Sequence, residues 1–124
     1  MLTRDLMLKD VVTANGAMTV RQCIELLFKR HVGCVVIIDD SGRCKGVFTE
    51  RDAIRTVAQD VPLDSKIEKI MTKNPFTINE DSSFEEAKNV IKTNNIRHLP
   101  VTSEDGKLVG LISARHILDE ICGI

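Results

Sequence analysis

An internal repeat constrains the fold of this 124-residue chain more than any other feature of its sequence. Residues 46–51 (GVFTER) align with residues 110–115 (GLISAR) at a shift of 64 positions, and the same shift pairs Met7 with Met71. Repeats of this kind are built from one supersecondary unit that buries its apolar face against another copy. We therefore assign a first repeat to residues 5–60, a linker to 61–68 and a second repeat to 69–124.

Each repeat is predicted to fold in the order β-α-β-β-α, which gives an α/β (α+β) protein of two tandem repeats packed with pseudo-two-fold symmetry. Apolar residues recur at helical spacing after Thr19 and after Ser83, each followed three positions later by Gln or Glu as in a capping box. A second helix starts at Thr49 or Ser113, both good N-cap residues. The expected strands are 11–14, 35–38 and 45–48 in the first repeat and 75–78, 99–101 and 108–112 in the second.

Composition argues against a nucleic-acid partner. The 17 basic and 18 acidic residues leave a net charge of −1, without the basic excess typical of nucleic-acid binding. The chain has no Trp or Tyr, so it lacks the stacking platforms that bind single strands.

We expect a cytoplasmic protein without a membrane partner. No apolar run approaches the roughly 18–20 residues of a membrane helix, and the N-terminus lacks the apolar core of a signal peptide. The four cysteines lack the two-residue spacing of zinc or redox motifs. We interpret them as reduced thiols that pack as small apolar groups, and we expect no metal site.

The strand-to-helix corner of the first repeat is the most informative motif for chemistry. Gly46 allows a ligand to approach the backbone closely. Thr49 and Asp52 are one helical turn apart and therefore lie on the same side of the helix. A carboxylate in this position can accept hydrogen bonds from two ribose hydroxyls. The alternative is that Thr49 only caps the helix and Asp52 only stabilises its N-terminal dipole.

The second repeat carries different polar groups. Its corner has Ser113, Arg115 and, in place of the carboxylate, His116, which is a poorer partner for a diol. Arg97 and His98 precede a strand, where the first repeat has the uncharged pair 33–34. The planar guanidinium of arginine suits phosphate. The alternative is a solvated Arg97 and a half-buried His98.

These motifs together resemble the CBS (cystathionine-β-synthase-type) domain pair, or Bateman module. The resemblance rests on Met71-Thr72, on residues 97–101 (RHLPV) and on the duplicated corners, in that order and at constant spacing. It implies a regulatory module, usually dimeric, that binds AMP, ADP, ATP or S-adenosylmethionine in clefts. It implies no cofactor and no catalytic residue.

The resemblance also implies residue roles. Thr49 and Asp52 would hold the ribose, and Arg97 and His98 would meet the phosphates. We predict one main cleft lined by Thr49, Asp52, Phe76, Thr77, Ile78, Arg97, His98 and Pro100. The second cleft, expected to be weak or empty, would be lined by Val12, Thr13, Ala14, Ser113, Arg115 and His116.

Four functions remain open from the sequence. The favoured one is a non-enzymatic adenine-nucleotide sensor that forms a homodimer and acts on a separate effector protein. The runner-up is a structural dimerisation module with degenerate clefts. An enzyme using Cys34 with His98 lacks an orienting third group, and a DNA-binding domain lacks a helix-turn-helix pattern.

Overall fold

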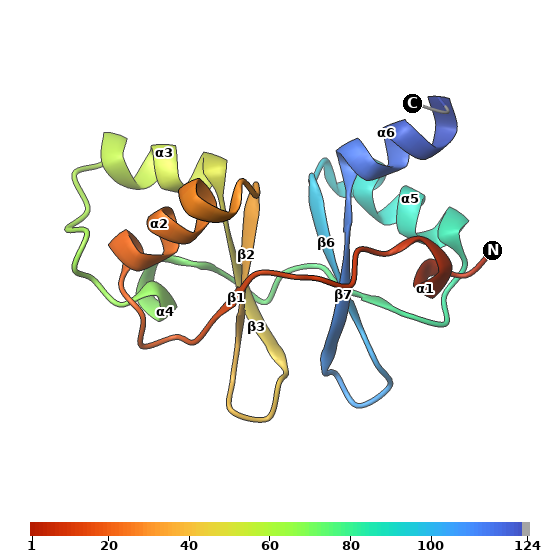
Figure 1. Ribbon diagram of the computed structural model, residues 1–124, viewed down its shortest axis with the longest axis horizontal. Coiled ribbons are helices and arrows are strands. Elements are labelled where there is room, and N and C mark those ends of the chain that lie inside the picture. The colour runs from red at the N-terminus through yellow and green to blue at the C-terminus, as the bar shows by residue number, and fades with distance from the viewer. Residues whose placement is uncertain (123–124) are drawn as a thin grey trace. The chain divides into compact units, whose positions relative to one another are not determined.

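Strands from each repeat assemble into a small sheet that is flanked by helices (Figure 1). The computed structural model describes residues 1–122. The chain divides into two compact units. Val11–Pro75 forms the first-repeat unit, whereas Met1–Asp10 joins the chain from Phe76 onward to form the second-repeat unit.

The first-repeat unit contains a four-stranded sheet in the order β1-β2-β3-β4. β1 runs parallel to β2, and the other neighbours are antiparallel. Its strands are β1 (Thr13–Ala14), β2 (Cys34–Ile38), β3 (Cys44–Thr49) and β4 (Thr72–Lys73). Its helices are α2 (Val20–Arg30), α3 (Glu50–Ala58) and α4 (Ile67–Ile70).

The second-repeat unit has a three-stranded sheet in the order β5-β6-β7, with β5 parallel to β6 and β6 antiparallel to β7. Its strands are β5 (Ile78–Asn79), β6 (His98–Thr102) and β7 (Leu108–Ser113). Its helices are α1 (Thr3–Leu6), α5 (Phe84–Asn94) and α6 (Ala114–Cys122). The α/β class with a duplicated β-α-β-β-α order is confirmed.

Side-chain caps set where the helices begin. Thr19 accepts a hydrogen bond from the N–H of Gln22, and the side chain of Gln22 accepts one from the N–H of Thr19, which completes a capping box at α2. At α5 the hydroxyl of Ser83 accepts a hydrogen bond from the N–H of Glu86.

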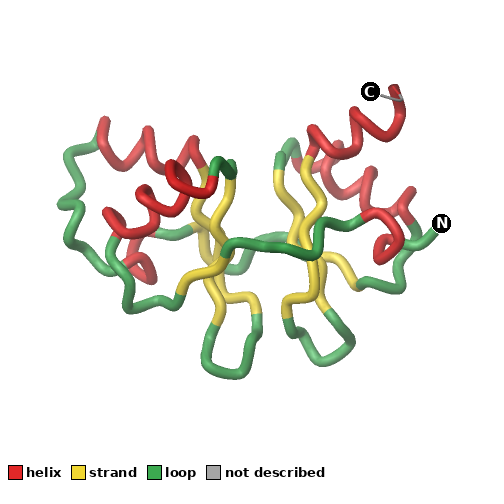
Figure 2. The backbone as a smooth tube through the Cα atoms, viewed as in Figure 1, coloured by secondary structure: helices red, strands yellow, loops and turns green. Residues whose placement is uncertain are grey.

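The two hairpins, between β2 and β3 and between β6 and β7, are visible in Figure 2. They turn through Gly42 and Gly106, whose φ angles are 86° and 83°. A glycine adopts this backbone conformation without steric cost.

Each unit has its own hydrophobic core between sheet and helices. In the first-repeat unit Val35, Ile37 and Phe48 are fully buried under α2. Their counterparts in the second-repeat unit are Leu99, Val101 and Ile112. Burying side chains of this size contributes about 1.5–3 kcal/mol each. The apolar β2–β3 and β6–β7 hairpins are therefore what hold the corners in place.

The first residues of each repeat, as assigned from the sequence, belong to the other repeat's unit. The residues of α4 and β4 pack on the first repeat, with Met71 against Gly46 in β3. The N-terminal residues pack on the second repeat, with Met7 against Gly110 in β7. Leu8 forms a bridge with Leu111. The N-terminal segment is thus remote in sequence from the unit that it completes, whereas α4 and β4 belong to the continuous stretch of the first-repeat unit.

The first strand of the second repeat differs from the expected one. Residues 75–78 were expected to pair, whereas the ladder contains Ile78 and Asn79. Pro75 has no N–H to donate to a ladder. The helices α1 and α4 have only four residues each, too few to show a helical period in the sequence.

Gly46→Ala is expected to destabilise the first-repeat unit, because a Cβ there would lie 2.4 Å from Met71 Sδ and 2.9 Å from the backbone oxygen of Thr72. Overpacking of this kind costs about 1–3 kcal/mol. Urea unfolding followed by circular dichroism measures the loss. Gly16→Ala is the matched control, since the nearest atom, Oε2 of Glu68 at 2.7 Å, is the end of a flexible side chain and not backbone. Equal midpoints for both variants and the wild type would contradict the close packing of Met71.

Candidate functional site

The strand-to-helix corner of the first-repeat unit holds a buried carboxylate. Asp52, in the first turn of α3, is only 5% exposed. Its Oδ2 accepts a hydrogen bond from the N–H of Thr49 at 3.0 Å, and its own N–H donates to Oγ1 of Thr49 at 3.2 Å. This reciprocal pair is a capping box, so the helix-capping interpretation of Thr49 and Asp52 is part of the structure.

Arg55 is a third member of this corner. Its Nη2 lies 3.1 Å from Oδ1 of Asp52, one turn further along α3. The sequence interpretation left Arg55 out, although its i, i+3 spacing from Asp52 is the available signal. A carboxylate offers about four lone-pair sites. Each oxygen of Asp52 therefore keeps acceptor capacity beyond its bond to Thr49 or Arg55.

Cys34 lies beside this carboxylate. It begins β2 and pairs with Thr49 across the β2–β3 ladder. Burial raises the pKa of its thiol to about 12, and the negative charges of Asp52 and Cys44 add to the rise. A thiol with so high a pKa stays protonated near neutral pH and is a poor nucleophile.

The corner of the second-repeat unit has the same geometry with other side chains. Oγ of Ser113 accepts a hydrogen bond from the N–H of His116 at 3.0 Å. His98 pairs with Ser113 across the β6–β7 ladder, and the carbonyl of Arg97 accepts from the N–H of Ala114 at 2.8 Å. The structure thus gathers these residues at one end of β6 and β7. The Arg97 side chain is exposed there and the His98 side chain is half-buried.

The resemblance implies that the first expected strand of each repeat lines the adenine. In the second-repeat unit Ile78 is buried, whereas Phe76 and Thr77 are exposed. Pro100, the remaining apolar residue of the predicted main cleft, is buried in β6. In the first-repeat unit Val12 and Ala14 are buried and Thr13 is exposed. Thr13 and Ala14 pair with Val36 and Ile37 in β2.

The predicted main-cleft residues come from both units. Thr49 and Asp52 belong to the first-repeat unit, where the structure places them in contact. The other six belong to the second-repeat unit: Phe76, Thr77, Ile78, Arg97, His98 and Pro100. The residues predicted for the second cleft also come from both units. The first-repeat unit holds Val12, Thr13 and Ala14, and the second-repeat unit holds Ser113, Arg115 and His116.

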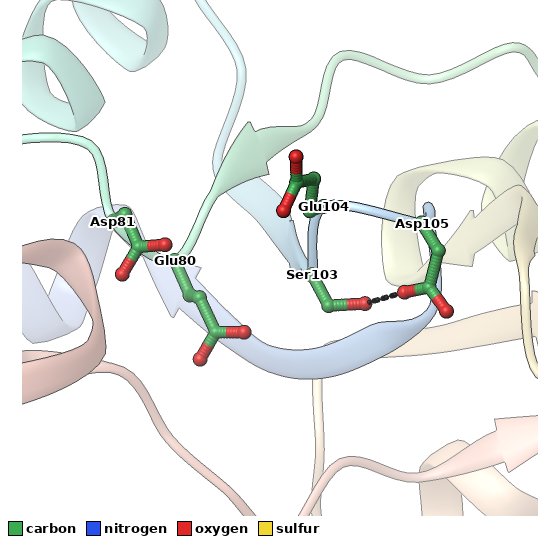
Figure 3. A pocket seen from close by; sticks show the side chains of 5 residues that line it. All are labelled: Glu80, Asp81, Ser103, Glu104 and Asp105. Atoms are coloured by element: carbon green, nitrogen blue, oxygen red, sulfur yellow. Dashed lines mark hydrogen bonds between the residues drawn. The ribbon is translucent and has the colours of Figure 1, made fainter.

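A shallow depression in the second-repeat unit is lined by acidic groups (Figure 3). It follows β5 and includes the β6–β7 turn, at the opposite end of β6 from His98. Its lining residues are Glu80, Asp81, Ser103, Glu104 and Asp105. So many carboxylates repel phosphate, so the depression does not suit a nucleotide.

Within the described part of the chain, no cluster of His, Cys, Asp or Glu is arranged to hold a metal ion. No helix in that part is long and apolar enough to cross a membrane.

The sequence model of the CBS domain family matches this chain twice, over residues 4–59 and 67–123. An uncharacterized 17.7 kDa protein from Acidianus ambivalens is 33% identical over 107 residues, which is 86% of this chain and 65% of that protein. The chain spans 65%, 22% and 57% of the lengths of three curated relatives that it matches.

Two solved structures show the same fold over the whole chain. The CBS domain pair of protein MJ0100, in complex with 5′-methylthioadenosine and S-adenosyl-L-methionine, has a TM-score of 0.91 at 26% identity. That alignment covers 99% of this chain and 97% of the other. A CBS domain protein from Pyrobaculum aerophilum, complexed with AMP, has a TM-score of 0.88 at 30% identity over 100% of both chains.

The buried Cys34 thiol is expected to make stability fall at alkaline pH. As the pH rises from 9.0, its ordinary pKa, toward 12, the unfolded chain loses this proton while the folded chain keeps it. The free energy of unfolding then falls by up to about 1.4 kcal/mol per pH unit. Urea unfolding at pH 8 and pH 10 should show wild type losing about 1 kcal/mol more than Cys34→Ala. Parallel losses in the two proteins would contradict the raised pKa.

Proposed function

The chain belongs to the CBS domain family, and from this premise we propose that it is a non-catalytic regulatory module that binds an adenine nucleotide or a related adenosine ligand. The buried carboxylate of Asp52, held at the strand-to-helix corner, is the observation that carries the proposal. The relatives complexed with AMP, or with S-adenosyl-L-methionine and 5′-methylthioadenosine, support this class of ligand.

Asp52 is proposed to bind the ribose hydroxyls, with Thr49 beside it. Its carboxylate is already oriented by the N–H of Thr49 and by Arg55, so little ordering is needed when a ligand binds. Two vicinal hydroxyls can donate to the two oxygens that remain partly unsatisfied. Such charge-assisted hydrogen bonds are roughly twice as strong as neutral ones.

Arg97 is proposed to bind the phosphate, with His98 next to it. The exposed guanidinium can form two parallel hydrogen bonds to phosphate oxygens. The exposed Phe76 is the proposed apolar neighbour of the adenine, together with Thr77, Ile78 and Pro100. We propose that one ligand needs both Asp52 and Arg97, and that the second set of residues, which has His116 in place of a carboxylate, binds weakly or not at all.

Regulation requires that the ligand bind one conformation of the protein better than another. We propose that the protein acts as a homodimer on a separate effector protein, which responds to that conformational change. The alternative is a purely structural association module. It is favoured by the reciprocal hydrogen bonds between Thr49 and Asp52, since those residues already have a helix-capping role.

Calorimetric titration with AMP, ADP, ATP, NAD, S-adenosylmethionine and adenosine separates these two functions. We expect at least one adenine nucleotide to bind, with adenosine binding more weakly than AMP. Absence of heat from every compound, together with unchanged melting temperatures, would leave the structural association module as the function.

Two variants test the residue roles. Asp52→Asn is expected to weaken both AMP and adenosine about tenfold or more, because it removes the charged acceptor (tenfold corresponds to about 1.4 kcal/mol). Arg97→Ala is expected to weaken AMP to a similar extent and to leave adenosine unchanged, since adenosine has no phosphate. Glu50→Gln, an exposed change in the same helical turn, is the matched control and should bind as wild type does. Equal affinities of wild type and Asp52→Asn would refute the ribose role.

A further inference from the structure

Two methionines occupy equivalent places in the two repeats. Met71 precedes β4 and lies over Gly46 in β3, so that a Cβ built on that glycine would overlap Met71 Sδ. Met7 lies over Gly110 in β7 in the same way. Both methionine side chains are half-buried and pack against the hydrophobic core of their unit. Each sulfur atom is therefore held against a strand, with no room for a further heavy atom between them.

The segments that carry these methionines pair only briefly with their sheets. β4, which follows Met71, lies at the edge of its sheet, and its ladder with β3 contains two residue pairs. Leu8, which follows Met7, forms an isolated bridge with Leu111 in β7. Short edge segments of this kind open locally without unfolding the whole unit. Local opening gives small solutes access to the two sulfur atoms.

Three cysteine thiols of the first-repeat unit are poorly suited to react with an oxidant. Oxidation of cysteine by a peroxide proceeds through the thiolate. Burial raises the pKa of Cys23 to about 11 and that of Cys34 to about 12. Burial also raises the pKa of the half-buried Cys44. These thiols stay protonated near neutral pH, whereas a thioether has no proton to lose and reacts wherever an oxidant reaches its sulfur atom.

We propose that Met71 and Met7 are paired modification sites, at which a hydroperoxide converts the thioether to a sulfoxide and thereby releases the methionine from its strand. The sulfur atom gains one oxygen atom as the O–O bond of the peroxide breaks. Sulfur is oxidised by two electrons, and hydrogen peroxide is reduced to water. Methionine sulfoxide reductases, with a thiol as reductant, remove the oxygen atom again, so the modification is reversible.

The sulfoxide does not fit the place of the thioether. Met71 packs against apolar core residues and against Gly46, and burying a polar oxygen there without a donor is unfavourable. The backbone oxygen of Thr72, 2.9 Å from the Cβ position at Gly46, is itself an acceptor and cannot pair with the sulfoxide oxygen. The oxidised side chain must therefore turn toward solvent, which uncovers β3 and removes the packing that holds β4 on it.

A consequence for ligand binding rests on the function proposed above. β3 ends at Thr49, three residues after Gly46, and leads directly into α3, which has Asp52 in its first turn. Release of Met71 from β3 is expected to loosen this corner. Oxidised wild type should therefore bind AMP several-fold more weakly than the reduced protein does.

Hydrogen peroxide treatment of the wild type and of a double variant, Met7→Leu with Met71→Leu, tests the proposal. Leucine keeps an apolar side chain of similar volume and cannot be oxidised. Peptide mass spectrometry locates each added oxygen atom, and urea unfolding measures stability. We expect oxygen on Met7 and Met71 of the wild type and a fall of its urea midpoint by about 0.5 M or more. The double variant should keep its midpoint although Met1, which is 75% exposed, is oxidised. Treatment with methionine sulfoxide reductases should restore the wild-type midpoint.

The double variant keeps all four cysteines, so a loss caused by thiol oxidation would occur equally in both proteins. An equal fall of both midpoints would overturn the proposal. It would also be overturned by an unchanged midpoint of wild type that carries both sulfoxides, or by a Met71 that stays unmodified while Met1 is fully oxidised.

Calorimetry with AMP separates this inference from the proposed function. Reduced wild type that binds no adenine nucleotide would refute that function, whereas the urea midpoints would still decide whether Met7 and Met71 are modification sites. Oxidised wild type that binds AMP as tightly as the reduced protein does would overturn the link between Met71 and the corner at Asp52.

Discussion

The carboxylate of Asp52 connects the fold of the first-repeat unit to its proposed function. Burial makes a carboxylate costly unless it is hydrogen-bonded. Here the N–H of Thr49 and the guanidinium of Arg55 satisfy part of its capacity, and the same bonds start α3. Local structure and the proposed ligand binding therefore depend on the same atoms.

That corner depends in turn on a segment from elsewhere in the chain. β3 leads directly into α3, and its central glycine, Gly46, is covered by Met71. The same arrangement recurs at Gly110 and Met7. The second-repeat unit joins Met1–Asp10 to the chain from Phe76 onward, whereas the first-repeat unit is the continuous stretch Val11–Pro75. The second-repeat unit therefore depends on residues that lie N-terminal to the first-repeat unit.

The sequence predicted the parts of this molecule that local rules determine. The helices after Thr19 and Ser83 and the corner at Thr49 could be predicted because capping residues and apolar spacing act over a few positions. The segment exchange could not be predicted in this way, since it is set by packing between residues far apart in sequence. The exposure of the Phe28 side chain could not be predicted either, because helical periodicity alone does not distinguish an apolar residue on the surface from one in the core. That Asp52 and Arg97 bind the same ligand molecule remains a prediction.

The most direct measurement of the ribose role is a thermodynamic cycle between Asp52 and the ligand hydroxyls. Calorimetry would compare AMP with 2′,3′-dideoxy-AMP on the wild type and on Asp52→Asn. If Asp52 binds the hydroxyls, removing them weakens binding to wild type about tenfold or more and has little further effect on the variant. An equal loss of affinity in both proteins would show that Asp52 and the ribose do not interact, and would contradict the account.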